Sequence, residues 1–82
     1  MEEKIGRITH FFGKIGVGVI ELTDGNLSVG DTIKIKGHEE FEQTVTSMQI
    51  DRQDIATAEK GKSVGLKVDK PEKEGDEVFL VS

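Results

Sequence analysis

The stretch of this chain that comes nearest to a chemical motif is Ala56-Thr57-Ala58-Glu59-Lys60-Gly61-Lys62-Ser63, which lacks only the first glycine of a phosphate-binding loop. Such a loop follows a buried strand and opens a helix, whose N-terminal amides hold phosphates. Here Ser63 is followed by Val64-Gly65-Leu66-Lys67-Val68, whose alternating polarity predicts a strand. We therefore predict that this motif binds no nucleotide cofactor.

Catalytic residue types are scarce. The chain contains no cysteine, and His10 and His38 have no third ligand at metal spacing beside either of them. Its carboxylates fall mostly in polar stretches where turns need solvation, and they form no convincing acid–base pair. The sequence predicts a protein that is not an enzyme and that carries no metal or other cofactor.

Basic residues are the more informative minority. Lys34 and Lys36 alternate with isoleucines and are expected to point outward from one strand, and Arg7 also alternates with apolar neighbours. With Lys14 in a glycine-rich turn, these four residues are our candidate contacts to RNA or to an acidic protein. The alternative is that they are solvated cations that protect a strand edge.

Three tracts share one residue pattern, and this pattern predicts the strands that must position these side chains. In each tract a glycine and two polar residues precede apolar residues, as where a turn opens a half-buried strand. The tracts are Val29-Gly30-Asp31-Thr32-Ile33-Lys34-Ile35, Lys60-Gly61-Lys62-Ser63-Val64-Gly65-Leu66 and Glu74-Gly75-Asp76-Glu77-Val78-Phe79-Leu80. Further strands are expected at residues 5–12 and 17–22, joined by a turn at 13–16, and at 41–50 with a bulge near Ser47. Gly18 is expected to mark a barrel corner.

Size and charge limit the functions that remain. The 82 residues predict a single domain over residues 1–82, and no apolar run has the length of a signal peptide or of a membrane span. The formal net charge is −5, which repels phosphate backbones at long range, so DNA is not an expected partner. No membrane partner is expected either, and a cytoplasmic location is the default prediction.

The order of several motifs resembles the second domain of translational GTPases such as elongation factor Tu. The motifs are Gly6-Arg7-Ile8, Gly25-x-Leu27-x-Val29-Gly30-Asp31, Thr44-Val45-Thr46-Ser47-Met48, Gly61-x-x-Val64-Gly65-Leu66 and Gly75-Asp76. The chain looks more particularly like the small proteins called translation elongation factor-like. The resemblance implies an all-β fold, a small closed antiparallel Greek-key barrel of about six strands.

That resemblance implies a non-enzymatic module that binds tRNA, the ribosome or another translation-associated partner, with or without a separately encoded GTPase. The Gly-Arg pair that elongation factor Tu carries on its second strand is replaced here by Ile20-Glu21, so no tRNA contact is transferred. A similar barrel ends some collagenase-like peptidases. The alternative function is accordingly a protein-interaction adaptor or accessory domain, with a peptidase as partner, and a small-molecule binding barrel is a third possibility.

Overall fold

A computed structural model of the chain describes residues 1–37, 40–70 and 73–81, and every regular element in these ranges is a β-strand. The strands are β1 (Glu2–Phe12), β2 (Val17–Leu22), β3 (Leu27–Ser28), β4 (Thr32–Lys36), β5 (Phe41–Thr44), β6 (Met48–Ile50), β7 (Gln53–Ile55), β8 (Thr57–Ala58), β9 (Ser63–Lys67) and β10 (Glu77–Val81).

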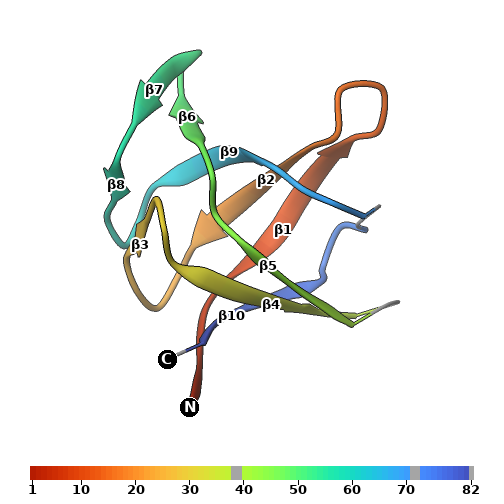
Figure 1. The fold of residues 1–82 in the computed structure, drawn as a ribbon, viewed down its shortest axis with the longest axis vertical. Helices are drawn as coiled ribbons and strands as arrows, with labels where there is room; N and C mark the ends of the chain where they lie inside the picture. Colours follow the sequence, from red (N-terminus) through yellow and green to blue (C-terminus); the bar gives the residue numbers. More distant parts are fainter. Residues whose placement is uncertain (38–39, 71–72, 82) are drawn as a thin grey trace.

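Eight strands form one antiparallel sheet in the order β5-β4-β10-β1-β2-β9-β6-β7, and β3 pairs with β8 in a small second sheet. The sheet curls, because residues 45–47 connect β5 at one end of the order directly to β6 near the other end. In Figure 1 β5 and β6 are two parts of one green path across the molecule. The N-terminal end of β1 pairs with the C-terminal end of β10, so the two termini of the chain lie side by side.

The predicted glycine turns before the strands are confirmed. Gly30, Gly61 and Gly75 have φ values of 99°, 94° and 91°, a left-handed conformation that side chains with a Cβ rarely adopt. The turn at residues 13–16 is also present, and Gly16 donates its backbone N–H to the Phe12 carbonyl at 2.9 Å. The positions of these turns were therefore predictable from the sequence.

The core lies on the concave side of the curled sheet and is aliphatic. Its fully buried members alternate along their strands with outward residues, as Ile33 and Ile35 do with Lys34 and Lys36. The larger buried side chains are Ile5, Ile8, Ile20, Leu22, Leu27, Ile33, Ile35, Met48 and Leu66. This confirms the predicted faces of β4, isoleucines inward and lysines outward.

Three features of the predicted fold need correction. The closed barrel of about six strands is wrong, because the hydrogen-bonded order is an open run of eight strands. The single strand at 41–50 is two strands, since Val45 leaves the ladder and exchanges backbone hydrogen bonds with Gly30 and Asp31 instead. The hairpin partner β7 was missed, because Gln53 and Asp54 carry no hydrophobic signal of a strand.

Candidate docking groove

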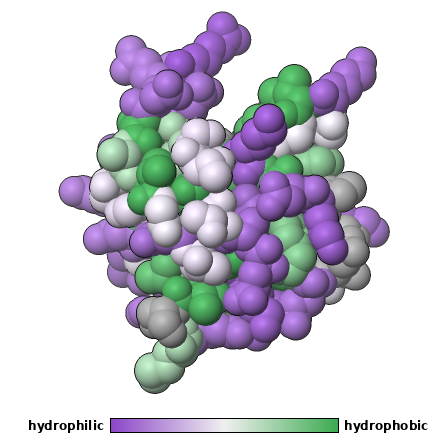
Figure 2. Space-filling model, viewed as in Figure 1, coloured by the Kyte–Doolittle hydropathy of each residue, from purple (hydrophilic) through white to green (hydrophobic). Residues whose placement is uncertain are grey.

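An open groove of about 470 Å³ lies on the outer, convex side of the sheet, between two hairpins. Val17 and Val19 of β2 and Gly65 of β9 line it, with Phe12 and Ile15 from the β1–β2 hairpin. The β6–β7 hairpin lines it through a second set, Gln49, Ile50, Asp51 and Arg52. Figure 2 shows a hollow between a polar projection over β6–β7 and the projecting β1–β2 hairpin, which carries an apolar patch. The groove is thus an apolar surface that the fold leaves uncovered.

Exposure of apolar side chains is concentrated at one end of this groove. Ile15 is 65% exposed and Phe12 is 46% exposed, whereas Val17 and Val19 are half-buried. A second depression of about 150 Å³ shares Val17, Gln49 and Gly65 with the groove and adds Lys67. Apolar surface that adjoins a polar rim is typical of an interaction site.

Gly65 keeps the floor of the groove low. It is extended in mid-strand, where a glycine weakens a sheet, and a Cβ at this position would meet Val17 Cγ1 at 3.4 Å. The backbone therefore does not require a glycine here. What a larger residue would change is the depth of the groove.

The wall opposite Phe12 is a strained two-residue turn. Ile50 pairs with Gln53, and the intervening Asp51 and Arg52 have φ values of 51° and 66°. Such turns favour Asn-Gly, because both central residues take positive φ. Arginine is a poor choice by local preference, and backbone strain of this kind concentrates at functional sites. The turn is braced by Gln49 Nε2, which donates to Asp54 Oδ1 at 2.9 Å.

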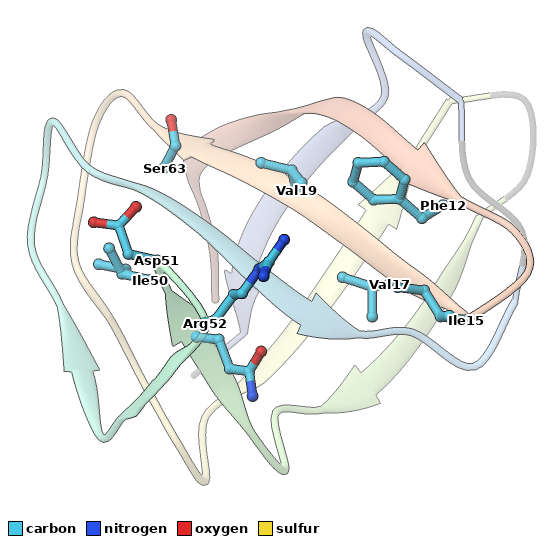
Figure 3. Close-up of a pocket in the computed structure, with 10 residues that line it drawn as sticks. Phe12, Ile15, Val17, Val19, Ile50, Asp51, Arg52 and Ser63 are labelled. Atoms are coloured by element: carbon cyan, nitrogen blue, oxygen red, sulfur yellow. The ribbon is translucent and has the colours of Figure 1, made fainter.

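The strained turn places a cation over the apolar floor. In Figure 3 the Arg52 side chain extends across β9 toward Val19, whereas Asp51 points away from the Phe12 end of the groove. Within the part of the chain that the structure describes, Arg52 makes no ion pair and no side-chain hydrogen bond. The groove therefore combines apolar contact area with a guanidinium that can donate hydrogen bonds to a carboxylate.

The residues predicted from sequence to contact a partner lie elsewhere, and three of the four are engaged within the protein. Arg7 contacts Glu21 through Nη2 and Oε1 at 3.1 Å. Lys34 contacts Glu2 at 3.0 Å and Glu40 at 3.5 Å. Lys36 contacts the same Glu2 at 2.7 Å and lies 4.7 Å from the centre of the Phe79 ring.

We call Glu2, Lys34, Lys36 and Glu40 the ion-pair face. Hydrogen bonds from Lys36 and then Lys34 lower the pKa of Glu2 from its ordinary value of 4.5. The hydrogen bond to Glu2 raises the pKa of Lys34 in turn. Both shifts favour the charged forms of Glu2 and Lys34. Lys34 and Lys36 are therefore already paired with carboxylates within the protein.

Lys14 is exposed in the β1–β2 turn, next to Ile15 of the groove. The four predicted residues are thus not assembled into one site: Arg7 lies on β1, Lys34 and Lys36 lie on β4, and β10 separates these strands. Their role as partner contacts stays a prediction. Arg52 and the groove were missed, and the polar tract Asp51-Arg52-Gln53-Asp54 gave no signal for them beyond its turn composition.

The near-match to a phosphate-binding loop is a turn, as expected. The backbone N–H of Gly61 donates to the Leu22 carbonyl at 2.7 Å, and that of Lys62 donates to the Glu59 carbonyl at 3.1 Å. Ser63 then begins β9 rather than a helix. These two amides are used within the fold, so they are not available to cradle a phosphate.

His10 forms no recognisable site with the other described residues. His10 is exposed, its ring lies 4.8 Å from the Phe12 ring at a tilt of 47°, and its Nδ1 lies 3.6 Å from Glu74 Oε1. His38 lies outside the described residues. Over residues 1–37, 40–70 and 73–81, no three His, Cys, Asp or Glu side chains are arranged to hold a metal ion. The same residues include no helix capable of spanning a membrane.

Comparison with known sequences gives one informative relative. The chain is 42% identical over 80 residues to an uncharacterized protease of Methanocaldococcus jannaschii. The match covers 95% of this chain but only 19% of that protein, so the chain spans about a fifth of the length of its curated relative. No family model matches the chain.

Comparison with solved structures identifies the fold. The C-terminal domain of a Geobacillus thermoleovorans "putative U32 peptidase" matches with a TM-score of 0.90 at 17% identity, covering 98% of this chain and 93% of that one. Its selenomethionine variant matches with a TM-score of 0.87 at 18% identity, covering 93% and 96%. At these identities the likeness shows the fold alone.

These comparisons overturn the resemblance to translation factors. The sequence relative is a protease, and the matching structures are domains of a peptidase, so the labels translation and elongation factor-like are wrong. The reason lies in the motifs: Gly30, Gly61 and Gly75 meet the need for positive φ in turns before strands, and glycine serves such turns in general rather than in translation factors specifically. A tRNA or ribosome partner loses its support with the resemblance.

Proposed function

We propose that this chain is a non-catalytic accessory domain of a U32 peptidase-like protein, formed by residues 1–82 and acting by binding the remainder of that protein or its separately encoded counterpart. The observation that carries the proposal is the 42% identity over 80 residues with part of a much longer protease. The fold of peptidase C-terminal domains agrees with it.

The residues favour binding over catalysis. The chain contains no cysteine, and His10 is solvent-exposed, so water would surround any reaction there. Catalytic groups normally work in a cleft that excludes water and perturbs their pKa values. The groove, by contrast, offers apolar contact area and one cation, which are the components of an interaction surface.

Binding in trans tests this proposal. We would delete from the M. jannaschii protease the segment that matches this chain, and titrate the truncated protein with the 82-residue chain by calorimetry. We expect saturable binding that is competed by the deleted segment itself, because the two should share an interface. Absence of heat and of competition would contradict the proposal.

Hydrolysis tests the non-catalytic part of the proposal separately. The chain alone should leave casein intact over long incubation. Hydrolysis that co-elutes with the chain through two successive columns would show that it is an enzyme. A cytoplasmic location for the whole protein stays a prediction.

A further inference from the structure

We propose that the groove between the β1–β2 and β6–β7 hairpins binds an apolar polypeptide segment that carries a carboxylate, with Arg52 as the partner of that carboxylate. The identity of the protein that supplies this segment, the remainder of a U32 peptidase-like protein, rests on the proposed function. The chemistry of the segment rests on the groove itself.

The apolar part of the ligand follows from the lining. Val17, Val19 and Gly65 form the floor, and Phe12 and Ile15 extend it onto the hairpin with large exposed side chains. Burying such surface is favourable in proportion to its area, and aromatic residues are enriched at interfaces. A polar segment would leave this surface exposed to water without gain.

The carboxylate follows from the distribution of charge. Arg7, Lys34 and Lys36 each have a carboxylate within 3.1 Å, as does Lys4, whose Nζ lies 3.0 Å from Glu77. Arg52 differs from these cations, because it extends over the groove without such a partner among the described residues. Lys67 adds a second cation where the groove continues, against the single carboxylate of Asp51 in its lining. With Arg52 and Lys67 against Asp51, the groove and its continuation carry a formal charge of +1 on a protein of net charge −5.

Two residues of the groove stand at positions where their residue type lowers the stability of the fold. Arg52 occupies a position of positive φ that glycine would occupy without strain, and Gly65 occupies a mid-strand position that a β-branched residue would fill better. Replacing either residue by the locally preferred type would remove the cation or fill the floor. A binding role explains why each residue stands where local structure favours another.

A peptide pair tests the chemistry directly. The probes are the hexapeptide acetyl-Ala-Val-Leu-Val-Glu-Ala-amide and its twin with Gln in place of Glu, titrated to millimolar concentration against isotope-labelled chain. We expect the Glu peptide to shift the NMR signals of the Val17, Val19 and Ile50 methyls and of the Arg52 Nε–H. The Gln peptide should bind roughly fivefold or more weakly, because the charge-assisted hydrogen bond is lost. Equal affinities, or shifts confined to other surfaces, would overturn the proposal.

Two variants and a matched control extend the test to the truncated M. jannaschii protease. R52G removes the cation and G65V fills the floor, whereas K4Q removes one cation from the other end of β1, about 25 Å along the strand from Phe12. We expect K4Q to bind like the parent chain, and R52G and G65V to bind roughly tenfold or more weakly, as for loss of a central contact. Preserved NMR dispersion confirms that each variant is folded.

The outcomes separate the two proposals. Equal binding by the parent chain and all three variants would overturn the groove and leave the accessory function standing. No binding by the parent chain would overturn the accessory function, and the peptide pair would then decide the groove. Concentration-dependent self-association that R52G abolishes would overturn the proposal, since the occupant would be a second copy of this chain.

Discussion

The outer surface of the sheet presents two regions that use charge in opposite ways. On the ion-pair face, Lys34 and Lys36 share the carboxylate of Glu2, and Lys36 also covers the Phe79 ring. In the groove, Arg52 extends over valines without a carboxylate partner among the described residues, and the aromatic Phe12 is 46% exposed. A cation that is already paired within the protein binds an anionic ligand weakly. The position of an unpaired cation therefore says more about a binding site than the number of cations does.

The largest expected effect lies beneath both regions and should not distinguish them. Ile35 lies under the ion-pair face and Ile20 lies under the groove, and both are fully buried. I35A and I20A should each lower the free energy of unfolding by about 2–5 kcal/mol, because each leaves a cavity in the same core. Urea denaturation measures this loss. A cost below about 1 kcal/mol for one of them would show that the two outer faces do not share one core.

Variants of the groove should have the next largest effect, with the opposite sign. R52G should raise the free energy of unfolding by up to about 1 kcal/mol, because glycine adopts φ of 66° without strain. G65V should raise it by roughly 0.5–1 kcal/mol, because valine suits a strand and its Cβ meets only ordinary contacts. The urea midpoints of R52G and G65V, each compared with that of the K4Q control, measure these two changes in stability. Destabilisation by either would mean that the residue is structurally required and would weaken the argument from its poor local fit.

Removing cations from the ion-pair face should matter less. K34Q and K36Q each break contacts between partly exposed side chains, whose screening by water keeps such pairs weak. We expect shifts of the urea midpoint smaller than those of the groove variants, and unchanged binding of the Glu peptide. A loss of peptide binding in K34Q or K36Q with R52G unaffected would exchange the roles of the two regions.

The smallest expected effect is a dependence on pH that belongs to the ion-pair face. The pKa of Glu2 is lowered by Lys36 and Lys34, so its contribution to stability is present above its ordinary pKa of 4.5 and is lost as the pH falls through the lowered value. The pKa of Lys34 is raised, so its contribution is lost only in strong alkali, above its ordinary value of 10.5. The thermal midpoint of E2Q should therefore fall less steeply than that of the parent chain between about pH 5 and pH 3. Parallel curves would show that Glu2 is not held by the lysines in solution.

Local features of the fold were predictable because they are decided over a few residues. The turns before β4, β9 and β10 depend on positive φ at one glycine each, and the inward faces of β4 follow from alternation over five residues. Whether the sheet closes into a barrel was not predictable in this way. The all-β class is correct, but whether the ladder closes depends on Val45, which bonds to Gly30 and Asp31 rather than continuing β5.

The sequence by itself determined an all-β fold of half-buried strands, because a glycine turn and a two-residue period act within one strand. Its motifs could not determine the family, since the same turns serve unrelated curled sheets. Only the tertiary structure decided which cations are neutralised, because Glu2 and Lys34 meet across strands that are 32 residues apart in the chain. It also brought Phe12, Val19 and Arg52 together around one groove. Pairing between distant strands sets such contacts, and no local pattern of residues encodes them.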